Sequence, residues 1–292
     1  MSDFSDLLAR GPIVGDGATG TLLHTASSPS GRVIPVLNLS SGELVADVHR
    51  GYVTAGAQLI QTNTFGASRI RLAPFGYADQ VEEINAAGVA LARRGATSGD
   101  HTVLVAGSVS PAVSAEQRGS EQSDARSQAL AEQVDALTNA GVDVLVLETF
   151  GYLDELLEAV EVITGRTAVP VIAQATFGPR GRMLSGHTPR DLAHALTDAP
   201  VSMIGINCTN GPQGTLGVIT ELAAHSSLPL SAQPNAGFPR RVSPDRLEYE
   251  VAPEYFARYS VRLVEAGATL VGGCCGTTPD HVAAVAAALS GH

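Results

Sequence analysis

The sequence predicts one (β/α)8 barrel, of the TIM-barrel type, that occupies residues 1–292 as a single domain. The first reason is that eight short apolar runs alternate with eight predicted helices, which is the element count of this fold. The second reason is a weak internal repeat in which Ala-Gly joins a helix end to an apolar run, at 55–57, 140–142 and 266–268. A glycine at that position suits the left-handed residue that ends many helices.

A doubly wound open sheet alternates strands and helices in the same way and is the competing fold class. The barrel is favoured because the predicted strands number eight and because the long connections follow strands rather than helices. In a barrel these connections lie at the carboxyl ends of the strands and form the catalytic face.

The eight predicted strands are short apolar runs, and each leads into a predicted helix. In chain order the strands occupy residues 12–16, 57–63, 102–107, 142–148, 169–175, 201–207, 228–233 and 269–271. The helices that follow them occupy residues 40–55, 79–94, 125–140, 153–162, 189–196, 212–224, 253–266 and the segment from 278 onward.

Local patterns support several of these boundaries. Ser40-Ser41-Gly42-Glu43 has the capping-box pattern and predicts the start of the first helix. Thr278-Pro279 predicts the start of the last helix, where the missing N–H of proline is not needed. The connections at 17–21, 108–123 and 235–251 are predicted to be loops, the first of them rich in glycine.

Composition excludes several classes of function. A net charge of −11 argues against binding to nucleic acid or to an anionic membrane, because both need clustered positive charge. All 18 basic residues are arginine, so Schiff-base aldolases, pyridoxal-phosphate enzymes and P-loop hydrolases are excluded for this chain by itself.

The sequence is also expected to be cytoplasmic. No apolar run is long enough to cross a bilayer, and the acidic N-terminus lacks the basic and apolar regions of a secretion signal. In that compartment cysteines stay reduced and serve metals or catalysis more often than disulfides.

Residues that can carry chemistry follow most of the predicted strands. Because the carboxyl ends of barrel strands lie on one rim, these side chains are expected to face one site. They are Asp16 after the first strand, Asn63 after the second, Glu148 after the fourth, Cys208 after the sixth, Asn235 after the seventh, and Cys274 with Cys275 after the eighth.

The three cysteines are the strongest indication of a site. Three thiolates at the ends of the sixth and eighth strands, whose loops can meet on one rim, could bind one Zn²⁺ and leave its fourth position open, as a catalytic zinc requires. Three alternatives remain open: free cysteines that are small buried hydrophobes, a redox-active Cys274–Cys275 pair, and a phosphate loop formed by the glycines after the eighth strand. Two adjacent cysteines on a Gly-Gly turn favour the metal.

The other four polar residues have structural explanations of different strength. Asp16 lies in a glycine-rich loop, where aspartate is an ordinary turn residue. Glu148 ends a nearly continuous apolar strand, where a carboxylate needs a partner or a ligand. Asn63 and Asn235 could each be a structural amide.

Six motifs in order resemble the homocysteine S-methyltransferases, including the homocysteine-binding module of cobalamin-dependent methionine synthase. They extend over essentially the whole chain, and the paired-cysteine motif with the upstream Asn-Cys is the most specific. The motifs are DGATGT (16–21), QTNTF (61–65), LETF (147–150), GINC (205–208), PNAG (234–237) and GGCCG (272–276).

The resemblance implies a zinc-dependent enzyme that methylates L-homocysteine to give L-methionine. It implies that Cys208, Cys274 and Cys275 bind the zinc and that the substrate thiolate takes the open position. It also implies that Asp16 and Glu148 hold the substrate amino group beside the backbone of Gly17. Asn235 matches an asparagine that fills the fourth zinc position in the absence of substrate, and Asn63 is predicted to belong to the substrate-binding set.

The methyl donor is not determined by these motifs. A sulfonium such as S-methylmethionine is the preferred donor, with S-adenosylmethionine, betaine and a separate corrinoid protein as alternatives. Other readings are the homocysteine-binding component of a split methionine synthase, a non-catalytic zinc- or thiol-binding barrel, and a phosphate-ligand barrel. The chain departs from the family pattern at Val36, where many relatives have an acidic residue, and at 107–111, where the usual Gly-Pro ending differs.

Overall fold

A computed structural model describes residues 3–26, 33–114, 118–119, 123–209, 211–243 and 246–291. The strands are β1 (Ile13–Val14), β2 (Leu59–Gln61), β3 (Leu104–Val109), β4 (Val144–Phe150), β5 (Val171–Ala175), β6 (Met203–Asn207), β7 (Leu230–Gln233), β8 (Arg240–Ser243), β9 (Arg246–Glu248) and β10 (Ala268–Val271).

The helices include the eight that were predicted and several shorter ones. They are α1 (Asp3–Leu8), α2 (Thr19–Ala26), α3 (Leu37–Ser40), α4 (Gly42–Thr54), α5 (Arg69–Leu72), α6 (Val81–Ala96), α7 (Ser123–Asn139), α8 (Leu153–Thr164), α9 (Pro189–Leu196), α10 (Pro212–His225), α11 (Pro253–Glu265) and α12 (Pro279–Leu289). Short 3-10 turns are η1 (Ile34–Val36), η2 (Ala73–Phe75) and η3 (Ala78–Gln80).

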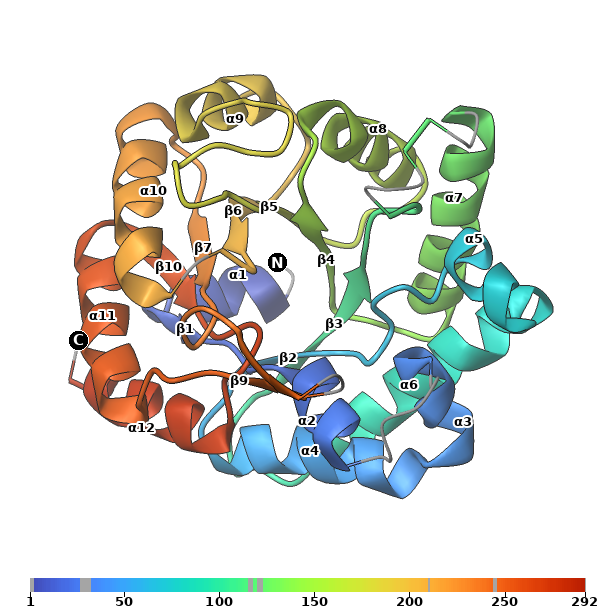
Figure 1. Cartoon of the computed structure of the whole chain (residues 1–292), viewed down its shortest axis with the longest axis horizontal. Coiled ribbons are helices and arrows are strands. Elements are labelled where there is room, and N and C mark those ends of the chain that lie inside the picture. Colours follow the sequence, from blue (N-terminus) through green and yellow to red (C-terminus); the bar gives the residue numbers. More distant parts are fainter. Residues whose placement is uncertain are drawn as a thin grey trace.

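Eight parallel strands form one sheet in the order β1-β10-β7-β6-β5-β4-β3-β2. The two ends of this order meet, because Gly15 forms a parallel bridge with Leu59 and the N–H of Asp16 donates to the Leu59 carbonyl at 2.9 Å. The ring of strands and the helices around it are seen in Figure 1. The predicted (β/α)8 barrel is therefore confirmed, and the open sheet is excluded.

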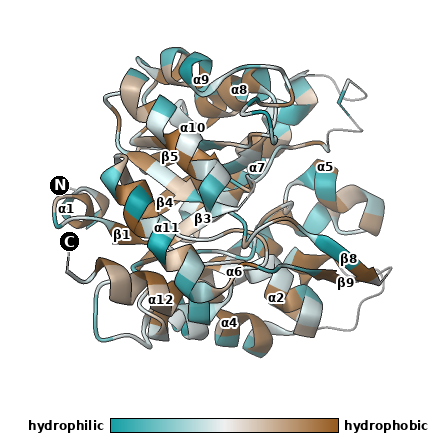
Figure 2. Ribbon diagram, turned by 60° about the vertical axis from the view of Figure 1, so that its left-hand side comes forward, coloured by the Kyte–Doolittle hydropathy of each residue, from teal (hydrophilic) through white to brown (hydrophobic). Residues whose placement is uncertain are grey.

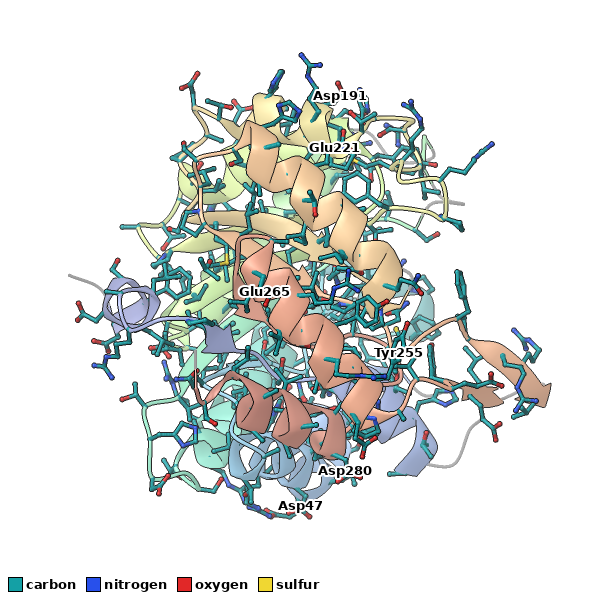
Figure 3. The ribbon with its side chains drawn as sticks, turned by 90° about the vertical axis from the view of Figure 1, so that its left-hand side faces the viewer. Asp47, Asp191, Glu221, Tyr255, Glu265 and Asp280 are labelled. Carbon is teal, nitrogen blue, oxygen red and sulfur yellow. The ribbon has the colours of Figure 1, made fainter. Side chains whose placement is uncertain are left out.

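Alternate residues of each strand point into the barrel, and the lower part of this interior is apolar. Phe4 and Leu7 of α1 pack against inward residues of seven strands and close that end. Figures 2 and 3 place α1 and the β8–β9 hairpin at opposite ends of the barrel. The inward apolar residues are Ile13, Leu59, Leu104, Ala106, Val144, Val146, Ile172, Met203 and Leu270.

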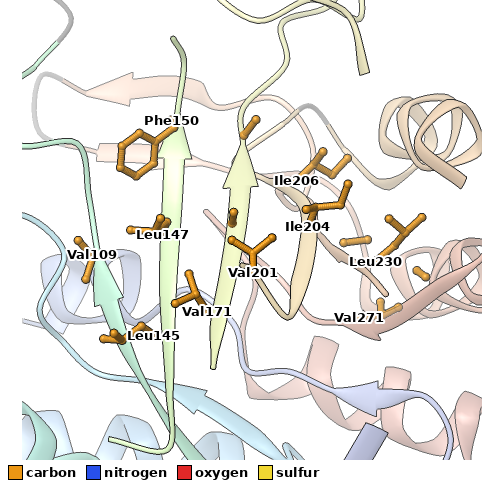
Figure 4. Packing of buried hydrophobic residues seen from close by; sticks show 14 of the residues in the cluster. Val109, Leu145, Leu147, Phe150, Val171, Val201, Ile204, Ile206, Leu230 and Val271 are labelled. Carbon is orange, nitrogen blue, oxygen red and sulfur yellow. The ribbon is translucent and has the colours of Figure 1, made fainter. Parts of the chain in front are cut away.

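The larger core lies between the strands and the surrounding helices. Leu145 and Leu147 of β4, Ile204 and Ile206 of β6, and Val271 of β10 all point outward into it (Figure 4). Acidic side chains lie on the outer faces of the helices, among them Asp191, Glu221, Glu265 and Asp280 (Figure 3). No helix among the described residues combines the length and apolar character needed to cross a bilayer.

Several boundary predictions are confirmed. The repeated glycines Gly56, Gly141 and Gly267 have φ of 102°, 88° and 110°, which is the left-handed conformation expected after a helix. Thr278 caps α12 with Pro279 in its first turn.

Other boundary predictions are wrong. Ser40 ends α3 and its hydroxyl donates to the Val36 carbonyl, so α4 begins after Ser41 without a side-chain capping bond. Helix α2 begins at Thr19, inside the predicted glycine-rich loop. The predicted loop at 235–251 contains the antiparallel hairpin β8–β9.

Candidate active site

A polar layer lies above the apolar interior of the barrel, at the carboxyl ends of the strands. It follows from the two-residue period of a strand, because Ser108, Glu148 and Asn207 continue the inward faces that begin with Leu104, Val144 and Met203. Gln61, Gln174 and Gln233 complete the layer. Sequence reasoning identified only Glu148 of these six, although the alternation within each strand was a signal that could have found the others.

Glu148 is fixed by two of these neighbours. The Ser108 hydroxyl donates to its Oε1, and Nδ2 of Asn207 donates to its Oε2 at 3.0 Å. Burial raises the pKa of Glu148 to about 7; the hydrogen bond from Ser108 opposes this shift and the Cys275 thiolate adds to it. Among the residues that the structure describes, no positively charged side chain contributes to this shift.

Asp16 is fully buried at the junction of β1 and β2. The Gln61 N–H donates to its Oδ2 at 2.7 Å, and Nε2 of Gln61 reaches Oδ1 at 3.5 Å. Burial raises the pKa of Asp16 to about 8; the bonds from Gln61 lower it and the charge of Glu148 raises it. Two buried carboxyl groups near each other favour the binding of a cation, which would compensate their negative charge.

A cavity of about 330 Å³ opens at this layer. Among the described residues that line it there is no lysine or arginine. Of the predicted site residues, its walls include Gly17, Asn63, Glu148, Cys208, Cys274 and Cys275. Asp16 and Asn235 are not part of this lining: Asp16 is hydrogen-bonded to Gln61, which is, and Asn235 donates its N–H to the Thr209 carbonyl at 3.2 Å.

The three cysteines meet at this cavity although Cys208 is more than sixty residues from the other two. The Sγ atoms of Cys208 and Cys275 are 3.7 Å apart, and all three Sγ atoms lie within 4.8 Å of one another. Zinc–sulfur bonds of about 2.3 Å at tetrahedral angles separate two sulfurs by about 3.8 Å, so the cluster fits a Zn²⁺ ion. All three thiols are free, so the structure gives no support to a Cys274–Cys275 disulfide.

The electrostatics of the cluster also fit a cation. Hydrogen bonds with Cys208 and Cys274 lower the pKa of Cys275 to about 3. A hydrogen bond with Cys274 lowers the pKa of Cys208, but the bond with Cys275 and burial raise it to about 12. Without a metal, one of the three thiols is ionised. A bound cation is needed to stabilise all three as thiolates.

The cysteines are held by the backbone of neighbouring loops. Cys208 has a left-handed φ of 49°, unusual for a residue other than glycine, and its N–H donates to the Gln233 carbonyl at 3.3 Å. Cys274 donates its N–H to the Pro234 carbonyl at 2.8 Å, and Ala236 donates its N–H to the Cys275 carbonyl at 2.9 Å.

Asn235 lies between these two backbone bonds. Its Oδ1 is buried and has no hydrogen-bond partner among the described residues. Because the residues on either side of it bond to Cys274 and Cys275, an unpaired buried oxygen on Asn235 is consistent with the predicted fourth ligand, which stays a prediction.

Thr277 joins the first loop to the cysteine turn. Its hydroxyl donates to the Cys274 carbonyl at 2.7 Å and accepts the N–H of Ala18 at 3.1 Å. The Tyr52 hydroxyl donates to the Thr277 carbonyl at 3.2 Å. A Cβ at Gly17 would lie 2.7 Å from the Thr277 hydroxyl oxygen and 2.8 Å from Tyr52, so only glycine allows this close packing.

Asn63 lines the cavity, but its side chain is committed to the protein. Its Nδ2 donates to the Ile34 carbonyl and to Oδ1 of Asn38, both at 2.9 Å. Asn38 in turn donates to the Asn63 carbonyl. The amide thus joins the second loop to the segment that precedes α4, and a contact with substrate stays a prediction.

Comparisons with known proteins agree with this geometry. The model of a family described as Homocysteine S-methyltransferase matches residues 13–289. The methionine synthases of Mycobacterium leprae and Mycobacterium tuberculosis are each 33% identical over 306 residues, which covers 99% of this chain and 25% of each relative. The chain spans about a quarter of the length of these curated relatives.

A solved structure extends the similarity to three dimensions. The homocysteine methyltransferase MmuM from Escherichia coli, in its metallated form, superposes with a TM-score of 0.82 and 28% identity. The match covers 97% of this chain and 98% of that one. Its oxidized form superposes with a TM-score of 0.78.

Proposed function

The chain belongs to the homocysteine S-methyltransferase family, and on that basis we propose that it transfers a methyl group to the thiolate of L-homocysteine to give L-methionine, with Zn²⁺ as its cofactor. The predicted family resemblance is confirmed by the family match. The observation that carries the proposal is one cavity lined by three clustered cysteines and the buried carboxyl group of Glu148, with the buried carboxyl group of Asp16 behind its wall.

Cys208, Cys274 and Cys275 would hold the metal. When bound, Zn²⁺ would keep the sulfur of homocysteine ionised at neutral pH, since a free thiol with a pKa near 8.5 is mostly protonated there. The donor set supports zinc because soft thiolate ligands in a tetrahedral arrangement are typical of it.

Asp16 and Glu148 would receive the ammonium group of the amino acid. Without ligand their pKa values are raised by burial, and a bound ammonium would lower both by supplying the missing positive charge. Ser108 and Asn207 hold the Glu148 carboxylate in one orientation, so little side-chain freedom is lost when the substrate binds. These residues would thereby orient the homocysteine chain.

The methyl transfer itself needs alignment more than acid–base catalysis. The homocysteine sulfur forms a bond to the methyl carbon while the bond from that carbon to the leaving group breaks and its electron pair stays with the leaving group. No proton moves in this step. In-line geometry is what the chain would contribute.

A cationic donor is favoured by the charge of the cavity. With Glu148 and one thiolate but no lysine or arginine in its described lining, and with Asp16 behind that lining, the cavity attracts a sulfonium such as S-methylmethionine. A sulfonium also has a good leaving group, because the thioether that departs is neutral. Betaine and a corrinoid methyl carrier remain the comparison donors.

The test is methionine formation from homocysteine with a panel of donors, before and after removal of metal with a chelator. We expect turnover with a sulfonium donor, about one zinc per chain, and loss of both on chelation with recovery on adding Zn²⁺. Full activity of metal-free protein, or of Cys208→Ser protein that no longer binds zinc, would refute the proposal. Zinc-dependent binding of homocysteine without turnover by any donor would indicate the non-catalytic alternative.

A further inference from the structure

Tyr249 follows strand β9 and packs against the cysteine turn, which is formed by residues 274–276. A Cβ at Gly276 would lie 2.1 Å from Cγ of Tyr249 and 2.5 Å from its Cβ. Gly276 also has a left-handed φ of 81°. Glycine is therefore required at this position both by the backbone conformation and by the aromatic ring that lies against it.

The hydroxyl group of the same side chain bonds to one of the thiols. A hydrogen bond joins Tyr249 to the side chain of Cys275. A thiolate has no proton to give, so in a metal-bound site the tyrosine hydroxyl must be the donor. Tyr249 is not among the residues that line the first cavity, so this bond reaches Cys275 from outside the lining.

The hairpin that carries Tyr249 is anchored at its base. The Ala236 N–H donates to the Cys275 carbonyl at 2.9 Å, and the Val251 N–H donates to the Ala236 carbonyl at 3.1 Å. Nε2 of His281, in α12, donates to the Val251 carbonyl at 2.8 Å. Because these bonds lie on both sides of Tyr249 in the chain, its backbone cannot leave the cysteine turn without breaking them.

The neighbouring side chains of β9 face solvent or the hairpin itself. Leu247 is 46% exposed, and Glu248 accepts a hydrogen bond from Arg240 at 2.8 Å across the two strands. The hairpin projects from the end of the barrel at which the cavity opens (Figure 2). Tyr249 differs from these neighbours because its half-buried ring turns towards the cysteines.

A hydrogen bond to a metal-bound thiolate has two physical effects. It restricts the rotation of the sulfur about the Cα–Cβ bond, so the ligand atom stays where the metal binds. It also draws electron density from the sulfur and thereby offsets part of the negative charge of three thiolates. Side chains that hold metal ligands in this way typically change metal affinity by roughly 10–100-fold.

Neutral donors are the groups that this site offers for that purpose. The described lining of the first cavity contains no lysine or arginine. Nδ2 of Asn207 makes a long contact with Sγ of Cys274 at 3.9 Å, and Tyr249 bonds to Cys275. Each of the two adjacent cysteines therefore has its own neutral donor, one from β6 and one from the hairpin.

We propose that Tyr249 is a positioning residue of the metal centre, whose hydroxyl donates to the Cys275 thiolate while its ring holds the hairpin against Gly276. This inference rests on the function proposed above in one respect, the binding of a metal by the three cysteines. Tyr249 acts on the reaction only through Cys275, because it does not line the space in which the substrate would bind.

The test uses Co²⁺ as a spectroscopic substitute for Zn²⁺ in the full chain. Metal-free protein is loaded with Co²⁺, and the sulfur-to-cobalt charge-transfer absorption in the near ultraviolet is recorded. Wild type is compared with Tyr249→Phe, which keeps the ring and removes the hydroxyl, and with Tyr249→Leu, which removes both. Tyr259→Phe is the matched control, because it removes the hydroxyl of a half-buried tyrosine in α11.

For Tyr249→Phe we expect the charge-transfer band to move to longer wavelength, because a thiolate that loses a hydrogen bond holds its electrons less tightly. The Kd for Zn²⁺, measured by competition with a chelating dye, should rise about tenfold. The Tm of the metal-free protein should stay within about 3 °C of wild type. Tyr249→Leu should show at least the same changes in the band and in the Kd, and Tyr259→Phe should behave as wild type.

An unchanged band and an unchanged Kd in Tyr249→Phe would overturn the proposal, as would equal changes in Tyr259→Phe. Neither measurement needs turnover, so this inference is tested separately from the function on which it rests. If wild type methylates homocysteine but Tyr249→Phe keeps the wild-type band and Kd, only the present inference fails. If no donor is turned over but the band and the Kd depend on the Tyr249 hydroxyl, only the methyltransferase proposal fails.

Discussion

His49 gives the clearest prediction on stability, because it is a buried histidine without partners. It lies in α4, its side chain is fully buried, and neither ring nitrogen has a hydrogen bond among the described residues. Helix α6 packs so closely that a Cβ at Gly95 would lie 2.4 Å from the Cβ of His49. Burial lowers the pKa of His49 from 6.5 to about 4, since the charged imidazolium would lose its hydration.

The direction in which stability changes with pH follows from the linkage between protonation and folding. A group whose pKa is lowered in the folded state contributes its full stability above the unfolded value and loses it as pH falls from about 6.5 towards 4. At pH 5 the unfolded imidazole is almost fully protonated and the folded one only slightly. Because pH 5 lies about 1.5 units below the pKa of the unfolded imidazole, protonation of the unfolded state lowers the unfolding free energy by ~2 kcal/mol.

The assay is urea unfolding followed by circular dichroism at pH 7 and pH 5, with a chelator in every sample. His49→Leu should lose about 2 kcal/mol less than wild type between the two pH values, because leucine cannot be protonated. His194→Gln, which changes an exposed histidine, should lose as much as wild type. Equal losses for wild type and His49→Leu would refute the reasoning. His49 is linked to the site through Tyr52, which lies one turn later in α4 and whose hydroxyl donates to the Thr277 carbonyl.

Three further predictions concern the barrel interior and the site. Gly205→Ala should destabilise the fold by about 3 kcal/mol or more in urea titrations, because its Cβ would lie 2.2 Å from the Ser231 carbonyl oxygen, which cannot move aside. Gly217→Ala is the matched control, and it should stabilise by about 0.5–1 kcal/mol, because the new Cβ enters open space in an exposed helix. Glu148→Gln should raise the KM for homocysteine about tenfold or more, and an unchanged KM would contradict the assigned role. The unfolding free energy of this variant should exceed that of wild type by most above pH 7, where the wild-type protein must hold a buried charge. Cys274→Ser should remove zinc in elemental analysis and leave the circular dichroism spectrum of the barrel intact, and full zinc content would argue against the ligand set.

The barrel and the convergence of the cysteines could be predicted because they depend on regular patterns. Eight strand–helix units fix which loops share a rim, so Cys208, Cys274 and Cys275 had to be near one another once the fold was assigned. The same reasoning brought Glu148 to the site. It did not find Ser108 or Asn207, because a serine or an asparagine near a strand end resembles an ordinary loop residue unless the inward alternation is followed to its last position.

Irregular segments were predicted less well for a different reason. Helix α2 lies in a glycine-rich stretch and the β8–β9 hairpin in a polar one, and neither stretch has a clear hydrophobic period, so their formation depends on tertiary contacts. The partners of Arg69 show the same limit. It binds Asp79 and Glu132 in the folded chain, and the sequence alone does not distinguish it from Arg71 in the same helix.

The charge of the site links these observations. Every positive group that the proposed reaction needs is brought by a ligand: the metal, the ammonium of homocysteine and the onium methyl centre. The described lining of the first cavity contains Glu148, the three cysteines and His24, but no lysine or arginine. Raised pKa values at Asp16 and Glu148 show that the free site bears unfavourable charge, which each cation relieves. Metal and homocysteine should therefore bind with positive coupling as the homocysteine sulfur joins the cysteines, and by linkage each should tighten the other by the same factor.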